Sequence, residues 1–450
     1  MHQFGSFCDP FVSTLRPHTL SFSIFIRFAR AQARCRVGWH RLCYLLPSWA
    51  GTHCPMNHME IDLLKKILTT KSMKGVFATV GLALSASTFA GATIKIDDTH
   101  SVSIGGGLRT SFRSVEDSAP SGEDRSKNYA VENMRLYVGA QVHENVKLTF
   151  NTECLACGEG NSKFFVLDAI VQLGFSEKFN IDIGRHLTPA DRIEMNGPFY
   201  GLNWNQYTVP LLPSDQNPFT AKAGRYGRDD GATIWGSFDK FQYAVGVFDG
   251  FSGPANSDDN LLIAGRFAYN FLNKESNPAY YTSSTYYGGA GDVFTVALFL
   301  QSQADGAGTG TESTNFFTYG FDVLFEKVLA NGAVVTLEGE FKDFDVDLTA
   351  TMIADPECFC LYDGTSYFAT AAYLFPQEVR FGKFQPYIRF TKNDPSDFFD
   401  SSDLIEIGVN YVISGHNARL NLNFTDGDAN LTGIPGANVN ALTIGVQIQI

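Results

Sequence analysis

The stretch that decides the fold is the last one, Val439-Asn-Ala-Leu-Thr-Ile-Gly-Val-Gln-Ile-Gln-Ile450. Apolar side chains occupy every second position through it: Leu442, Ile444, Val446, Ile448 and Ile450. A period of two is that of a β-strand with one apolar face and one polar or small face. About sixteen such segments can be marked after residue 100, each roughly 9 to 13 residues long, as in strands that cross a membrane.

The connections between these segments alternate in length. The predicted strands are 102–113, 130–142, 145–153, 164–175, 179–186, 230–238, 240–249, 261–272, 292–302, 315–326, 332–344, 366–375, 383–391, 404–414, 417–425 and 439–450. Connections after even-numbered strands are mostly short, apart from 273–291, whereas those after odd-numbered strands are mostly longer and polar. Short periplasmic turns and long external loops are typical of bacterial barrels. We therefore predict an all-β, transmembrane antiparallel β-barrel of about sixteen strands.

The composition agrees with this fold class. The chain has 450 residues, with 42 Gly, 39 Phe and 18 Tyr, and is 44% hydrophobic. After residue 92 there is no apolar run long enough for a membrane-spanning helix. Of 34 Lys/Arg and 47 Asp/Glu, ten and three precede residue 93, which leaves 24 and 44, a net charge of −20. Such an acidic balance argues against a nucleic-acid partner.

Strand parity separates an outward apolar face from an inward charged one. Lipid-facing predictions include Leu136, Val138, Ala140 and Val142; Phe165, Leu167, Ala169, Val171 and Leu173; Phe317, Tyr319, Phe321, Val323 and Phe325; Tyr367, Ala369, Ala371, Tyr373 and Phe375. The opposite parity carries Arg109, Arg135, Lys147, Asp168, Asp182, Arg266, Asp322, Glu338, Glu340, Lys342, Lys383, Arg389, Glu406 and Arg419. Charges in hydrocarbon would each cost a few kcal/mol, so their common parity predicts a wet interior.

The N-terminal part divides into two segments before the barrel. Lysines from Lys65 to Lys74 precede an apolar stretch, 75–85, and small residues up to Ala92. This order predicts a secretory signal peptide over 59–92. Residues 1–58 form either a misassigned, non-structural extension, which we favour, or a metal-binding or membrane-attached extension. The barrel is predicted over 93–450.

The segment Phe179-Asn-Ile-Asp-Ile-Gly-Arg185, which is followed by Leu187-Thr-Pro189, resembles the phosphate- and polyphosphate-selective porins of bacterial outer membranes. The strand 102–113 and the layout of 93–450 fit this family as well. The resemblance implies a homotrimer of sixteen-stranded barrels, and inward arginines and lysines that conduct anions, which adds Arg185. The chain departs from the pattern at His186 and Leu187, where the family has Lys and Phe.

In sixteen-stranded porins the third loop folds into the lumen and narrows it. By this resemblance we expect the longest loop, 187–229, to form the constriction, with His186, Arg192, Arg225 and Arg228 as candidate residues beside the inward set. The alternative is that this loop covers the barrel mouth or a trimer interface.

Four cysteines follow residue 92: Cys154 and Cys157 in the second external loop, and Cys358 and Cys360 in the sixth. In an oxidising compartment they predict disulfides, for which three pairings are open. A Cys₄ metal site is the alternative.

The function expected from these patterns is an outer-membrane porin through which small hydrophilic solutes and ions diffuse passively. We expect no enzymatic activity, cofactor or metal, because no G-x-S-x-G motif occurs and the few histidines after residue 92 have no evident partner. The expected partners are outer-membrane lipid, further copies of the chain, and the solutes. Two alternatives stay open: an anion- or phosphate-selective channel, and a structural or adhesive surface barrel with little conduction.

Overall fold

The computed structural model describes residues 91–157, 164–216, 223–275, 280–396 and 398–450. Within them, sixteen antiparallel strands form a closed ring, since each pairs with the next and the last pairs with the first. The ring consists of β2 (Ser101–Val115), β3 (Asn128–His143), β4 (Val146–Cys157), β5 (Phe165–Ser176), β6 (Phe179–Leu187), β7 (Arg228–Phe238), β8 (Phe241–Phe248), β9 (Leu262–Asn270), β10 (Val293–Gly308), β11 (Ser313–Val328), β12 (Val334–Asp345), β13 (Gly364–Leu374), β14 (Lys383–Pro395), β15 (Ser402–Ser414), β16 (Ala418–Gly427) and β17 (Val439–Gln449). All sixteen predicted strands are confirmed.

One further strand, β1 (Ala92–Lys95), was not predicted. It pairs with residues 101–104 of β2, next to the point where the C-terminal residue Ile450 pairs with Gly106. The edge of β2 that β17 leaves open is thus completed by β1. A strand of four exposed residues has too short a pattern to be recognised from the sequence.

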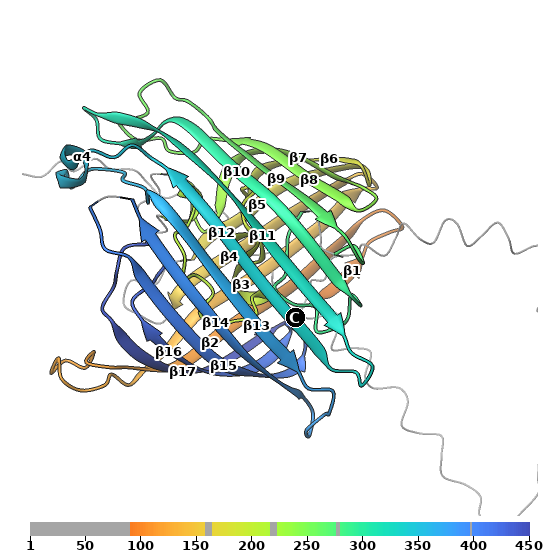
Figure 1. Cartoon of the computed structure of the whole chain (residues 1–450). Coiled ribbons are helices and arrows are strands. Elements are labelled where there is room, and N and C mark those ends of the chain that lie inside the picture. The colour runs from red at the N-terminus through yellow and green to blue at the C-terminus, as the bar shows by residue number, and fades with distance from the viewer. Residues whose placement is uncertain (1–90, 158–163, 217–222, 276–279, 397) are drawn as a thin grey trace, which may run out of the picture. The chain divides into compact units, whose positions relative to one another are not determined.

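The two ends of the barrel differ as predicted. Long connections and the short helix α4 (Ala350–Ala354) lie at one end, and β1 lies at the other (Figure 1). The fifth predicted external loop is the exception. Its range, 303–314, is mostly strand, because β10 and β11 extend to a tight connection at 309–312. In the described residues no helix has the length and apolarity needed to cross a bilayer.

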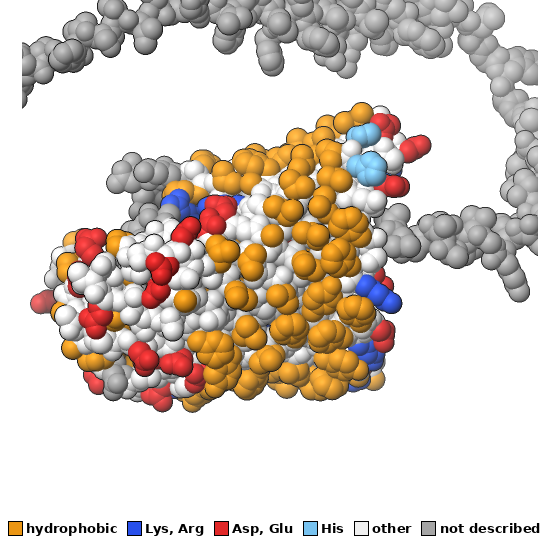
Figure 2. Space-filling model, turned by 90° about the horizontal axis from the view of Figure 1, so that it is seen from above, with side chains coloured by type: hydrophobic (Ala, Val, Ile, Leu, Met, Phe, Trp, Pro, Cys, Tyr) orange, Lys and Arg blue, Asp and Glu red, His pale blue; other side chains and the backbone are white. Residues whose placement is uncertain are grey.

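On the face shown in Figure 2, a band of apolar side chains crosses the barrel wall between two ends that carry the charged side chains. Phe321 and Tyr319 are among the exposed aromatics on the predicted outward parity. Two outward predictions are wrong. A bulge in the pairing of β4 with β5 inserts Leu167, which is buried, and turns Phe165 inward against Tyr226. An extra residue of this kind reverses the parity of everything on one side of it.

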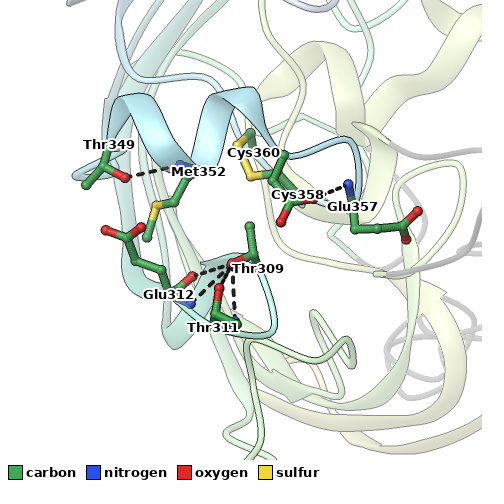
Figure 3. The surroundings of a disulfide bond; sticks show 9 residues. Thr309, Thr311, Glu312, Thr349, Met352, Glu357, Cys358 and Cys360 are labelled. Carbon is green, nitrogen blue, oxygen red and sulfur yellow. Dashed lines mark hydrogen bonds between the residues drawn. A yellow bond between two sulfur atoms is a disulfide. The ribbon is translucent and has the colours of Figure 1, made fainter.

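The structure joins Cys154 to Cys157 and Cys358 to Cys360. The first pair lies at the end of β4 rather than in the second external loop, because β4 is longer than predicted. The second pair follows α4 and lies beside the 309–312 connection (Figure 3). Between its cysteines, Phe359 pairs with Gly308 and stacks on Phe251, with 4.4 Å between ring centroids. Phe359, between the two cysteines, therefore joins this loop to the end of β10 and to the loop that carries Phe251.

The predicted extension, 1–58, lies outside the described residues, as does the predicted signal peptide, 59–92, up to residue 90. Both stay predictions.

Candidate functional site

The third external connection, L3, spans residues 188–227, and its described parts, 188–216 and 223–227, lie inside the barrel. Inward side chains from three separate parts of the wall donate to its backbone carbonyls: Arg109 to Trp204 at 2.9 Å, Arg389 to Gln206 at 2.9 Å and Arg419 to Gly201 at 2.6 Å. Those arginines are on β2, β14 and β16. Because L3 is bound by inward side chains of several strands, it lies in the lumen, as was predicted for the longest loop.

L3 begins with the helix α2 (Arg192–Tyr200), which starts at a capped end. Asp191 is the N-cap, and its carboxylate accepts from the backbone N–H of Glu194 at 2.9 Å. The helix is kinked at Gly197, where φ is 59°, and is followed by Pro198. The positive φ favours glycine, and proline prevents a continuous ladder, so the chain turns here and crosses the lumen.

Arg192 holds the start of α2 in a buried ion network. Its guanidinium donates to both carboxylate oxygens of Glu275, at 2.7 and 2.8 Å, and to Asp322 of β11 at 3.1 Å. Asp322 also accepts from Arg266 of β9 at 2.9 Å. Burial alone would raise the pKa of Glu275, but the charge and hydrogen bonds of Arg192 lower that pKa to about 2. Glu275 thus forms a buried ion pair with Arg192.

A second network surrounds Lys342 of β12. Its ammonium lies 2.6 Å from Asp191, 2.9 Å from Glu194 and 3.5 Å from Glu340. All of these side chains are almost fully buried. Nearby in L3, burial raises the pKa of Asp215 to about 6, although the Arg228 charge opposes this shift. Lys342 therefore joins the first turn of α2 to the wall.

The remaining inward cations mostly face carboxylates too. Arg135 lies 2.5 Å from Glu153, Arg228 lies 3.0 Å from Asp168, and Arg389 lies 3.3 Å from Glu338. Arg109 has Glu132 at 3.7 Å. The lumen thus holds many charges of both signs that largely cancel one another in pairs.

The prediction that Arg185 lines the pore is wrong. Arg185 shares the parity of the exposed Ile183 and forms a bidentate pair with the exposed Asp230. Since Asp182 points inward, Arg185 three positions later points outward. The family resemblance had placed it in the pore against its own parity.

The other candidates face inward in different settings. Asp182 accepts from the indole of Trp235 at 3.0 Å, and His186 contacts Thr233 at 2.8 Å. Arg225 lies over the ring of Phe165, with 4.5 Å to the centroid. Lys147 is exposed and has no ion pair within the described residues.

Sequence reasoning missed Glu275 and the segment that carries it. The connection from β9 to β10 (residues 271–292) was noted only as a long exception among short turns. Its length was the available signal, since long connections in compact proteins are usually functional. Among the described residues, no group of three or more His, Cys, Asp and Glu side chains is arranged to hold a metal ion.

A barrel with a polar interior, into which the third loop folds, suits a channel. The profile of the Gram-negative porin family matches residues 78–447. The chain belongs to the Gram-negative porin family. This membership and the closed sixteen-stranded barrel make the chain an outer-membrane porin, a channel for passive diffusion.

Several solved structures are similar to this chain at low sequence identity. The anion-selective porin of Comamonas acidovorans is 14% identical, with a TM-score of 0.51, and the alignment covers 78% of this porin and all of that chain. OmpT of Vibrio cholerae is 15% identical, with a TM-score of 0.48 and coverage of 80% and 100%. OmpF of Salmonella typhi is 12% identical, with a TM-score of 0.47 and the same coverage. No curated protein matches significantly.

Proposed function

We propose that this porin is a general, weakly selective channel for small hydrophilic solutes and ions, and that it performs no chemistry and needs no cofactor. The observation that carries the proposal is the pairing of charges in the lumen. Arg135, Arg192, Arg228, Arg266, Lys342 and Arg389 each have a carboxylate within 3.5 Å. Ion preference follows the net charge of rings that line a pore, and paired charges contribute little to it.

The phosphate-selective resemblance supplies the second candidate, an anion-selective channel. It is favoured by inward cations that no carboxylate neutralises. Lys147 is exposed without an ion pair in the described residues, and Arg419 donates to the carbonyls of Gly201 and Leu202 and to Gln447. These two side chains leave some positive charge on the wall.

The test is single-channel recording in planar bilayers, with porin purified from the outer membrane of a Gram-negative host. Reversal potentials in a potassium chloride gradient give the ion preference. Ohmic conductance with a reversal potential near zero supports the general channel. Strong anion preference with block by millimolar phosphate supports the second candidate. A folded, heat-modifiable barrel without conductance leaves the structural or adhesive role as the explanation.

We further propose that the porin works as a homotrimer in outer-membrane lipid and is exported by the segment 59–92. The family resemblance supports the trimer, and the basic, apolar and small-residue order supports the export signal. Light scattering of the detergent-purified porin tests the first. N-terminal sequencing of porin from the outer membrane tests the second, with a start close to residue 92 as the expected result.

A further inference from the structure

The connection between β9 and β10 enters the barrel from the end opposite L3. Its base is held where the N–H of Phe271 donates to Phe294 at 2.7 Å and that of Asn273 to Asp292 at 3.1 Å. All other connections at this end are short turns. The part that reaches inward, residues 280–288, is called the insert arm below.

The insert arm is bound to L3 along its length. The Tyr280 hydroxyl donates to the carbonyl of Leu187 at 2.8 Å, where L3 begins. The Thr282 hydroxyl donates to the carbonyl of Arg192 at 2.7 Å, and the N–H of Ser284 donates to that of Tyr200 at 3.1 Å. The insert arm and L3 therefore contact each other from the first to the last residue of α2.

The far end of the arm reaches the turn between β15 and β16. Nε2 of His416, in that turn, lies 2.9 Å from the carbonyl oxygen of Thr285 and 3.0 Å from the Ser283 hydroxyl. The ring of Tyr287 is 4.9 Å from the His416 ring. The arm thus runs from β9 and β10 past the ends of β11 to β14.

A carboxylate of the wall holds the arm in place. Glu326 of β11 is fully buried, and accepts from the Thr285 hydroxyl at 2.7 Å, the N–H of Tyr286 at 2.9 Å and the N–H of Gly288 at 2.8 Å. Ser284 donates to Glu338 of β12 at 2.6 Å. Three donors on one buried carboxylate define a single position for the arm, because leaving that carboxylate unsatisfied would be costly.

Exposure of the inward side chains differs around the wall at this end. Thr336 of β12, which donates to the arm-binding Glu326, is fully buried, as are Gln385 of β14 and Asn410 of β15, and Asn410 also donates to the carbonyl of Leu202 in L3. On the other side, Lys147 of β4 is exposed and Thr149 and Gln172 are half-buried. Water therefore reaches the wall along β4 and β5 and is excluded along β12 to β15.

We propose that the insert arm is a second constriction element, which closes the periplasmic mouth along β10 to β16 and confines solute passage to the wall formed by β3 to β5. L3 narrows the channel from outside, and the arm, docked on L3, narrows it from the periplasm. Lys147 then lies beside the periplasmic exit, where its charge acts on passing ions.

The first experiment removes the arm. Asn273 and Asp292 are hydrogen-bonded, so a two-residue Asn-Gly turn can replace residues 274–291. In single-channel recordings of the full chain purified from outer membranes, we expect conductance to rise, up to roughly twofold if half of the mouth is uncovered. Unchanged conductance of a heat-modifiable barrel would mean that L3 alone limits the channel, and would overturn the proposal.

The second experiment does not depend on the deletion folding. Lys147→Cys and Thr336→Cys place a thiol at matched inward positions near the start of β4 and of β12. A membrane-impermeant cationic methanethiosulfonate is added from the periplasmic side, with the unsubstituted chain as background. We expect Lys147→Cys to react and conductance to change, while Thr336→Cys stays unmodified. Comparable rates at both positions, or no reaction at Lys147→Cys, would contradict the proposed route.

Discussion

Lys342→Met tests the charge network that fixes L3 to the wall. The Lys342 side chain is 1% exposed, and its ammonium lies 2.6 Å from Asp191 and 2.9 Å from Glu194. At an effective dielectric constant of about 20, attraction across roughly 3 Å is about 5 kcal/mol for each pair, before the cost of desolvation. Methionine is unbranched like lysine but lacks the ammonium, so the carboxylates stay buried without a cation. Breaking a buried pair in this way costs about 3–5 kcal/mol.

The assay is urea unfolding of the refolded porin in lipid vesicles, followed by tryptophan fluorescence and by heat modifiability on gels. Lys147→Met is the matched control, since it makes the same substitution at an inward but exposed lysine, and a cost within about 0.5 kcal/mol is expected. A double variant, Lys342→Met with Glu194→Gln, should recover part of the loss. If Lys342→Met and Lys147→Met lower the unfolding free energy equally, the assignment of Lys342 as an anchor is wrong.

Three further predictions concern L3 and the wall. The Asp215 pKa is about 6 in the fold and 3.8 in its absence, so the folded state binds an extra proton and loses stability as pH rises from about 4 to 6. Asp215→Asn should therefore reduce the fall in unfolding free energy between pH 4 and pH 7 by up to about 3 kcal/mol, as measured by urea unfolding at both pH values. If the free energy of unfolding falls equally with pH in the variant and the unsubstituted porin, the prediction is wrong. Gly445→Val should cost about 1–3 kcal/mol and shift Trp204 fluorescence, because a Cβ there would lie 2.5 Å from the indole; an unshifted spectrum would argue against this packing. Arg185→Gln should leave the reversal potential unchanged while Lys147→Gln moves it toward cation preference, and equal shifts would return Arg185 to the pore.

The strands could be predicted because the apolar alternation within each strand shows by itself which face meets lipid. Val439–Gln449 needs no knowledge of its neighbours to alternate, and the same holds for the other fifteen. Alternation gave the wrong face only where the pairing with a neighbouring strand contains a bulge. The bulge that buries Leu167 and turns Phe165 inward is a property of the β4–β5 pair, and neither strand shows it alone.

The lumen could be predicted only in part, because alternation gives the face of a side chain and not its partner. Arg192 is 83 residues from Glu275 and 130 from Asp322, and Lys342 is 148 from Glu194. Each of these pairs exists only after L3 and the β9–β10 connection have entered the barrel. Inward charge was therefore predictable, whereas its neutralisation was not.

Net charge and lumen charge are separate properties of this porin. The part after residue 92 carries a net charge of −20. Exposed carboxylates gather at the end with the long loops (Figure 2), whereas in the lumen most arginines and lysines lie beside a carboxylate. Exposed charges more than about 10 Å from the passage are screened at physiological salt. Ion preference should therefore depend on the few inward cations without a carboxylate, Lys147 above all, and on which wall the solute follows. The position of the insert arm therefore affects ion selectivity, because an arm that covers β10 to β16 leaves Lys147 beside the exit.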